Sequence, residues 1–276
     1  MGKLDILKSI RDEINISIEG SENINYNTPN LFVSNHNCLM DIFYLPMSID
    51  VPIVDMISAR LIYKKVYDRQ KMVNDYLYSM PIEAHGGKIY SDMCLESGVN
   101  LLNSGISIGI FPEGAYLNGN NIYRGRTGAS RILFGAIEKG IKVNLVPVGI
   151  NISGNYDLDS YDFDDRTVNI EILPNINCDN WYDMFKESNT FFDKNNALHG
   201  PIDTCMKKIA DALGRPYVND YIELYPKGNV IFSNGDTVLT DLAQSEEFIN
   251  EYEIELNTRM KTMKKEILKN EMARVQ

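Results

Sequence analysis

Short apolar segments alternate with amphipathic segments over most of the chain, and this alternation constrains the fold more than any other feature. The segments with strand character are 31–34, 53–58, 81–84, 106–111, 143–151 and 166–173. Those with helix character are 4–14, 39–47, 60–78, 88–103, 127–139 and 201–213. Because a strand followed by a helix usually returns to a parallel strand, we predict an α/β fold with a largely parallel mixed sheet flanked by helices. Binding residues in such folds gather at the carboxyl ends of the strands.

Residues 215–276 leave this pattern. Asn234-Gly235 lies within the segment 230–239, which places apolar residues on both sides and predicts a β-hairpin. Apolar side chains at helical spacing follow, and they are Phe248, Tyr252, Leu256, Met260, Met263 and Ile267. We therefore predict an α/β domain over 1–214, followed over 215–276 by the hairpin and a long amphipathic helix that packs on this domain or extends from it.

His36 and Asp41 form the first candidate for catalysis. His36 directly follows the apolar run 31–33, where a strand would deliver a side chain into a turn. Five steps of about 100° inside one helix would separate the two side chains, but a turn at His36 that leads into a helix capped near Asn37 lets them meet. Nδ1 then donates to the carboxylate and Nε2 can take a proton, as a general base does. The alternative is a capping histidine beside the start of a helix.

Two further blocks strengthen the catalytic interpretation. Phe111-Pro112-Glu113-Gly114 closes the apolar segment 106–110, and Val146-Pro147-Val148 lies in a later strand. Over residues 30–213 the order and spacing of these blocks resemble the glycerolipid acyltransferase superfamily, the lysophosphatidate acyltransferase-like enzymes, which carry an N-H-x-x-x-x-D block, then F-P-E-G, then V-P-V. The resemblance implies an acyltransferase that moves a fatty acyl group from a thioester donor, acyl-CoA or an acyl-carrier protein, to a hydroxyl of a lysophospholipid-like acceptor.

The resemblance also implies roles for individual residues. His36 would be the general base, and Asp41 would hold its tautomer and stabilise the imidazolium. The backbone N–H groups of Asn37 and Cys38, near a helix start, are candidates for the oxyanion site. Acyl-CoA or the carrier protein enters as substrate, and neither a metal nor a further cofactor is expected.

The acceptor site departs from the family pattern. Members that act on glycerol phosphates usually have two arginines where this chain has Ala84 and Tyr116, and neither residue replaces the bidentate recognition of phosphate by arginine. Other side chains are open to two interpretations each, acceptor binding or local architecture: Glu113 and Gly114 in their tight turn, Arg124, Arg126 and Arg131 as anion contacts or helix caps, and His85 as an acceptor contact or a loop residue. A non-phosphorylated hydroxyl or amine compound is therefore the alternative acceptor.

Two other classes of function stay open. Cys38 lies inside the histidine block, so a Cys–His nucleophile pair would make the protein a thiol-dependent thioester hydrolase or a ping-pong transferase. A free cysteine is more often a small packed side chain, and the family resemblance explains the histidine without the thiol. The third class is a catalytically silent lipid-binding protein, although such a protein would be expected to have lost His36 or Asp41.

Composition limits the partners and the location. A net charge of −11 argues against binding to nucleic acid, because a phosphate backbone has to be neutralised over a broad surface. The four cysteines are widely spaced, which indicates neither a zinc site nor a disulfide framework. Without a leader or an apolar stretch of about 18 residues, we expect a cytoplasmic protein that either is free or lies at the inner face of the membrane.

Charged clusters suggest docking surfaces on this acidic chain. Lys64, Lys65 and Arg69 lie in an expected helix and are candidates for docking the donor. The basic C-terminal helix has four options: to pack on its own domain, rest on a membrane, receive an acidic acyl-carrier protein or pair with a second copy. The acidic run 157–165 lacks the glycine and distal glutamate of a calcium loop and is expected to be a solvated loop.

Overall fold

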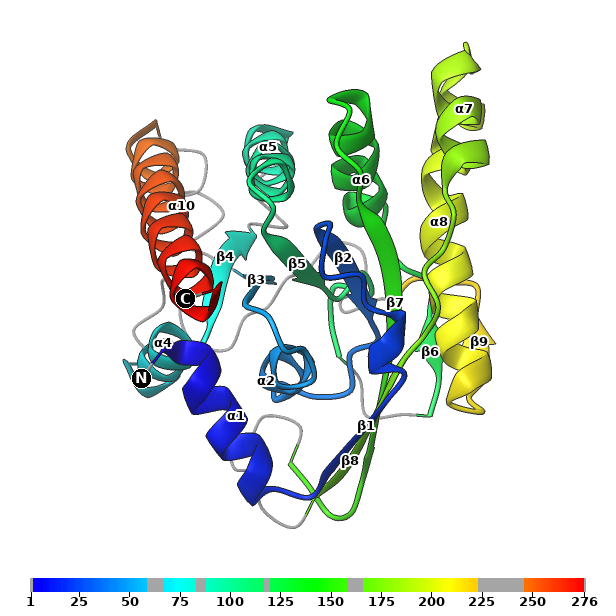
Figure 1. Ribbon diagram of the computed structural model, residues 1–276. Coiled ribbons are helices and arrows are strands. Elements are labelled where there is room, and N and C mark those ends of the chain that lie inside the picture. Colours follow the sequence, from blue (N-terminus) through cyan, green and yellow to red (C-terminus); the bar gives the residue numbers. More distant parts are fainter. Residues whose placement is uncertain are drawn as a thin grey trace.

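The computed structural model describes residues 2–58, 67–82, 88–116, 120–157, 166–222 and 246–275. The strands of its central sheet are β1 (Ile16–Glu19), β2 (Asn30–Ser34), β3 (Ile53–Ser58), β4 (Tyr78–Ile82), β5 (Ser107–Ile110), β7 (Asn144–Ser153) and β8 (Thr167–Ile172). They lie in the order β1-β8-β7-β2-β5-β3-β4, and all neighbours are parallel except β7 and β8 (Figure 1). The short strands β6 (Ile122–Tyr123) and β9 (Tyr217–Val218) form a separate parallel pair.

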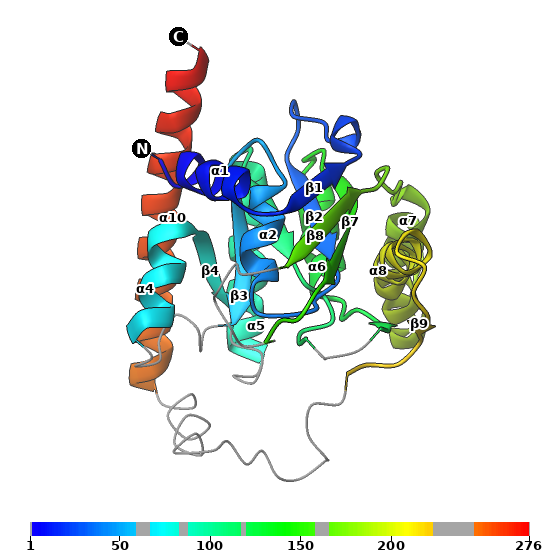
Figure 2. The ribbon, with the colours of Figure 1, turned by 90° about the horizontal axis from the view of Figure 1, so that it is seen from below.

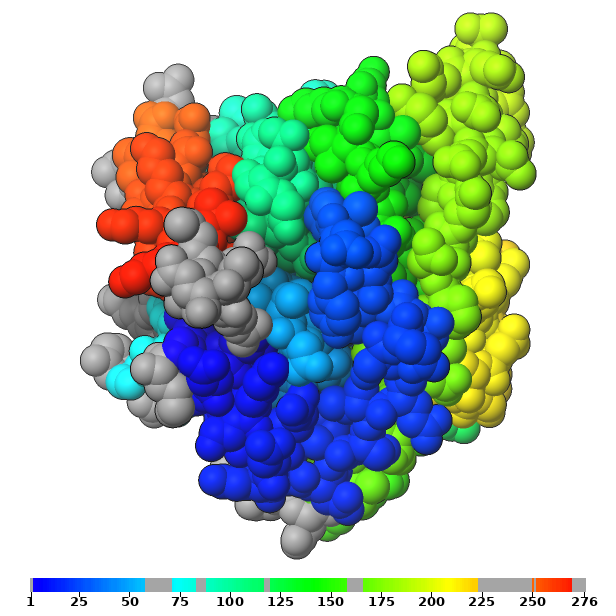
Figure 3. Space-filling model, in the orientation of Figure 1, coloured from blue at the N-terminus to red at the C-terminus, as the bar shows by residue number. Residues whose placement is uncertain are grey.

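Helices cover both faces of this sheet. Those of the described residues are α1 (Lys3–Glu13), α2 (Asp41–Met47), α4 (Tyr67–Tyr76), α5 (Lys88–Asn103), α6 (Gly128–Glu138), α7 (Asp179–Glu187), α8 (Phe191–Ala212) and α10 (Glu246–Val275), with a 3-10 turn η1 (Ser21–Asn23). In Figure 1, α1, α2 and α4 lie on one face, and α5, α6, α8 and α10 lie on the other. The space-filling view shows the side chains of α10, α5, α6 and α7 forming a continuous layer (Figure 3).

Strand β2 shows why both faces must be covered. All of its residues are buried, and successive side chains of a strand point to opposite faces. Accordingly, Leu31 and Val33 belong to the apolar cluster under α5, α6 and α8, while Phe32 belongs to the cluster under α1 and α2. The predicted α/β fold with a largely parallel mixed sheet is therefore confirmed.

Some predicted boundaries were wrong. The helix predicted over 201–213 begins ten residues earlier in the structure, since α8 runs from Phe191 to Ala212. Proline favours the first turn of a helix, yet Pro201 lies in the middle of α8, and its side chain is buried. The short strand β1 and the helix α7 were not predicted from the pattern.

The C-terminal helix α10 packs on its own chain, next to β4 (Figure 2). Tyr252, Leu256, Met263 and Ile267 are buried on its inner face. The Tyr252 hydroxyl donates to the carbonyl of Pro81 at 2.8 Å, which fixes the helix against the end of strand β4. Of the four options for this helix, packing on its own domain is the one that the structure shows, and contacts of its outer face with a membrane, carrier protein or second copy stay predictions. The predicted hairpin lies outside the described residues.

None of the helices in the described stretches has both the length and the apolar character that crossing a bilayer requires.

Asp55 is an unusual residue for the middle of a buried strand. Its carboxyl group in β3 lies over Gly109 of β5, where a Cβ would come within 2.3 Å of Oδ1, and opposite Ser79 of β4. Neither oxygen has a hydrogen-bond partner among the described residues. Burial therefore raises the pKa of Asp55 well above its ordinary value, and the group is held as a neutral acid.

This carboxyl group predicts a particular dependence of stability on pH. The unfolded chain releases the Asp55 proton above about pH 4 while the folded chain retains it, so stability falls as pH rises from there to the folded pKa. Asp55→Asn should remove this loss, about 1.4 kcal/mol for each pH unit between the two pKa values. Urea unfolding at pH 5 and pH 8 measures the change for both proteins. Asp12→Asn, at an exposed carboxylate, is the control, and an equal slope in wild type and Asp55→Asn would contradict the prediction.

Candidate active site

The site forms where parallel strands end side by side. Strand β2 lies between β5 and β7, with Val33 in register with Ile110 and Pro147. The loops after β2 and β5 therefore leave the sheet at the same edge. His36 is on the first of these loops and Glu113 on the second, so the two sequence blocks that are far apart in the chain meet in space.

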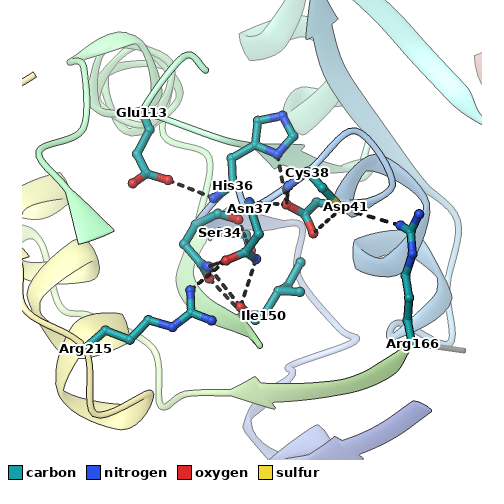
Figure 4. Close-up of polar contacts among 10 residues, drawn as sticks. Ser34, His36, Asn37, Cys38, Asp41, Glu113, Ile150, Arg166 and Arg215 are labelled. Carbon is teal, nitrogen blue, oxygen red and sulfur yellow. Dashed lines mark hydrogen bonds and ion pairs between the residues drawn. The ribbon is translucent and has the colours of Figure 1, made fainter. Parts of the chain in front are cut away.

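His36 and Asp41 are in direct contact. Nδ1 of His36 lies 3.0 Å from Oδ2 of Asp41, and because an ionised carboxylate is only an acceptor, Nδ1–H is the donor. Asp41 is fully buried as the first residue of α2, whereas 12% of the His36 side chain is exposed. Figure 4 shows the imidazole standing above the carboxylate with its far edge turned away from it. This geometry leaves Nε2 free to act on a substrate.

The oxygen that binds His36 also organises the loop. Oδ2 of Asp41 accepts the backbone N–H of Cys38 at 2.9 Å and that of Asn37 through a shorter bond. These two N–H groups point at Asp41 and not at a substrate, which contradicts their predicted role in an oxyanion site. The reason is that α2 begins at Asp41, so its side chain turns back and accepts the N–H groups of the loop that precedes the helix.

Glu113 links the two loops. Its Oε2 accepts the backbone N–H of His36 at 2.7 Å, and Oε1 accepts that of Tyr123 at 2.8 Å. Burial raises the pKa of this carboxyl to about 7, while the two N–H donors favour its ionised form. Of the two interpretations of Glu113, loop architecture is the one its contacts support. Gly114 follows with φ 75°, and a Cβ there would lie 3.2 Å from Nε of Arg126.

Aromatic rings flank the imidazole. Phe111 stacks on His36 with ring centroids 4.5 Å apart, and Tyr116 meets it edge-on at 4.9 Å. Tyr116 occupies the position where the glycerolipid acyltransferases that act on glycerol phosphates usually have an arginine. Among the described residues, the side chains stacked on or edge-on to the His36 ring are thus aromatic.

Cys38 is not placed to be a nucleophile. Its side chain is fully buried, and burial together with the nearby Asp41 carboxylate raises the pKa of the thiol to about 12. The thiolate is the reactive form of cysteine, so this thiol stays unreactive near neutral pH. The arrangement therefore disfavours the Cys–His hydrolase.

Two arginines that were not predicted from the sequence flank the loop that follows β2. Arg215 donates to Asn37 Oδ1 at 2.7 Å, and the buried Arg166 lies 3.8 Å from the Cys38 sulfur (Figure 4). Both come from outside the recognised sequence blocks, after β7. Their only sequence signal is position, since Arg166 directly precedes β8 and Arg215 follows Gly214 at the end of α8.

The three arginines predicted to hold an anion have different partners. Arg124 forms a two-bond ion pair with Asp203 of α8, at 3.0 and 2.9 Å. Arg131 lies on α6, where its side chain donates to Thr127 at 3.3 Å. Arg126 is exposed, its guanidinium is 5.3 Å from the centre of the Tyr221 ring, and its Nε lies beside Gly114. Arg126 is thus the member of this group that lies directly at the Phe-Pro-Glu-Gly loop.

Several predicted residues lie beyond the structural description. His85, Lys64 and Lys65 fall outside the described residues, as does the acidic run after Asp157. Arg69 belongs to α4, but its side chain falls outside the described part of the structure. The acceptor role of His85 and the donor docking by the basic cluster stay predictions.

The fold and the His–Asp site define the class of protein. The chain belongs to the acyltransferase family, within the glycerolipid acyltransferase superfamily: the family model described as Acyltransferase matches residues 15–151, which include His36, Asp41 and Glu113. Among solved structures, the chain is similar to the 1-acyl-sn-glycerophosphate (LPA) acyltransferase PlsC from Thermotoga maritima, with 16% identity, a TM-score of 0.44, and coverage of 75% of this chain and 79% of that one. No curated protein matches the chain. What this acyltransferase acts on must therefore be inferred from its own residues.

Proposed function

We propose that this acyltransferase moves a fatty acyl group from a thioester, acyl-CoA or acyl-carrier protein, to the hydroxyl of a lysophospholipid-like acceptor. The observation that carries the proposal is the 3.0 Å contact between His36 Nδ1 and the buried Asp41, which leaves Nε2 unengaged by this pair. Nε2 takes the hydroxyl proton as the acceptor oxygen attacks the thioester carbonyl, and the Asp41 charge stabilises the imidazolium that forms.

The second half of the reaction releases the thiol. The tetrahedral intermediate collapses by breaking its carbon–sulfur bond, and the proton held by His36 passes to the thiolate or to water. A thiol with a pKa of about 8.5 leaves without strong acid assistance, so one histidine suffices for both proton transfers. No acyl-enzyme forms, which fits a site whose cysteine is buried and protonated.

Among the described residues, Arg126 and Tyr116 are the two side chains that bear on the identity of the acceptor. Arg126, exposed beside Gly114, supports contact with the phosphate of a lysophospholipid. Tyr116 at 4.9 Å from the His36 ring favours the second candidate, a non-phosphorylated hydroxyl or amine compound. The two candidates share their chemistry and differ in the head group.

A substrate panel tests the proposal. The purified protein is incubated with palmitoyl-CoA or a palmitoyl-carrier protein and with lysophospholipids, small alcohols and amines, and the products are identified by mass spectrometry. Formation of an ester or amide, with thiol release that requires the acceptor, supports transfer. Thiol release without an acceptor would indicate a hydrolase, and lipid binding without turnover would indicate a silent binding protein.

Arg126→Gln tests the head group. If Arg126 contacts a phosphate, its loss should raise KM for a phosphorylated acceptor about tenfold and leave KM for palmitoyl-CoA unchanged, since a charge-assisted hydrogen bond is lost. Initial rates at varied acceptor concentration measure this. Lys139→Gln, at an exposed lysine at the end of α6, is the matched control. Equal KM values for Arg126→Gln and wild type would favour the non-phosphorylated acceptor.

A further inference from the structure

Arg215 brings a positive charge to the catalytic loop from outside the segment that matches the family. It directly follows the end of α8, where Gly214 adopts φ 61° and the backbone N–H of Arg215 closes the helix by donating to Ala210 O at 2.9 Å. This is a glycine-terminated helix end, which gives the next residue a fixed direction. The partly buried Arg215 side chain is thereby aimed at the back of the loop that follows β2.

The guanidinium joins two asparagine side chains. One nitrogen donates to Asn37 Oδ1 at 2.7 Å, and the other donates to Asn151 Oδ1 at 2.5 Å. Because arginine has no acceptor, Asn37 must present its oxygen to it, and its NH2 group then donates to Ile150 O at 3.0 Å. The Asn35 side chain also donates to Asn37 Oδ1, at 3.2 Å, as a second donor beside Arg215. The Asn37 side chain is therefore held in one orientation.

The position of Asn37 determines the position of the carboxylate. Its backbone N–H donates to Oδ2 of Asp41, and that oxygen is the one that binds His36 Nδ1. The chain of contacts thus runs from Arg215 through Asn37 and Asp41 to the imidazole. Figure 4 shows Arg215 reaching Asn37 from the side opposite the His36 ring, so it has no direct access to a substrate beside that ring.

We propose that Arg215 is a positioning residue for the His36–Asp41 pair: by holding Asn37, it keeps the carboxylate oxygen against the imidazole. The inference rests on the acyl transfer proposed above for its kinetic consequence. The charge of Arg215 also faces Asp41 and Glu113, and it lowers the pKa of Glu113 against the effect of burial. Arg215 thus also favours the ionised Glu113 that binds the backbone N–H of His36.

A double-mutant cycle tests the contact. Arg215→Gln and Asn37→Ala should each lower kcat by about 10²-fold, as misplacing a reacting group does, with KM for palmitoyl-CoA within about twofold of wild type. If both act through the same carboxylate, the double variant should be no slower than the slower single variant. Arg11→Gln is the matched control, because Arg11 is a partly buried arginine that donates to a carbonyl, Met47 O, away from this loop. Independent losses that multiply, or unchanged kcat in Arg215→Gln, would overturn the proposal.

A second measurement does not depend on turnover. The Nδ1 proton that His36 shares with Asp41 is observed by proton NMR and assigned by its absence in His36→Gln. It should shift or exchange faster with water in Arg215→Gln and Asn37→Ala, and stay as in wild type in Arg11→Gln. An unchanged resonance in Arg215→Gln would refute positioning. If the resonance changes in Arg215→Gln but the wild-type protein transfers no acyl group, the proposed function is refuted and the positioning role is not. Arg215→Lys, which keeps the charge but has a single nitrogen, replaces Arg215→Gln if that variant fails to fold.

Discussion

His36→Ala should lower kcat for acyl transfer by about 10³-fold or more while KM for the thioester changes little. The imidazole is the only group that the structure places next to Asp41 with a free nitrogen toward the exposed side of the described residues, so its loss leaves the acceptor hydroxyl without a base. Release of CoA from palmitoyl-CoA, followed in the presence of the acceptor found by the panel, measures the effect.

The cavity left by the histidine offers a second readout. His36 lies against Phe111 and Tyr116, so its removal opens a space with one stacking and one edge-on aromatic ring. Added imidazole should enter this space and restore part of the activity of His36→Ala. His199→Gln is the control for loss of a histidine elsewhere, since His199 lies in α8 and contacts Tyr221. If His36→Ala keeps more than a tenth of wild-type kcat, His36 is not the base.

Replacement of Asp41 should separate two roles of the carboxylate. In Asp41→Asn the amide oxygen can take the place of Oδ2, which accepts the N–H groups of His36, Asn37 and Cys38. The loop and the histidine tautomer are then retained, and the loss, about 10²-fold in kcat, reflects the missing charge beside the imidazolium. In Asp41→Ala all three donors lose their acceptor, and the loss should be larger, about 10⁴-fold.

The order of the two variants is the test. Steady-state kinetics give kcat, and thermal unfolding followed by circular dichroism separates loss of activity from loss of fold. Asp203→Asn serves as the control for a partly buried carboxylate in an ion pair, since Asp203 of α8 binds Arg124. An Asp41→Asn protein as inactive as Asp41→Ala would show that the tautomer is lost and that the amide does not adopt the expected orientation.

Much of the sheet and the central pair of the site could be predicted from the sequence. The strands are predicted by their short apolar runs. His36, Asp41 and Glu113 could be found because each of the two sequence blocks that hold them directly follows such a run. The parallel arrangement of β2, β5 and β7 then brings these strand ends together. The predicted boundaries of α5 agree with the structure, because its apolar residues follow the helical period over sixteen residues.

Other features depend on contacts between distant segments and had no local signal. Arg215 and Asn37 are 178 residues apart, and only the fold brings them to 2.7 Å. The predicted oxyanion role of Asn37 and Cys38 failed because it assumed a helix start directly after His36, whereas the helix begins at Asp41 and its side chain takes both N–H groups. Likewise, nothing in the sequence indicated that the Asp55 carboxyl lacks a hydrogen-bond partner among the described residues, because β3 otherwise has the apolar character of a buried strand.

The placement of α10 has a consequence for association between molecules. β4 is the outermost of the described strands at its end of the sheet. An outermost strand can pair with a strand from another chain through its free backbone groups, which leads to aggregation. Pro81 lacks an N–H, and its carbonyl is occupied by the Tyr252 hydroxyl of α10. At the other end of the sheet, β1 is only four residues long. We therefore expect the C-terminal helix to hinder the pairing of β4 with a strand of another copy of this protein, an effect separate from catalysis.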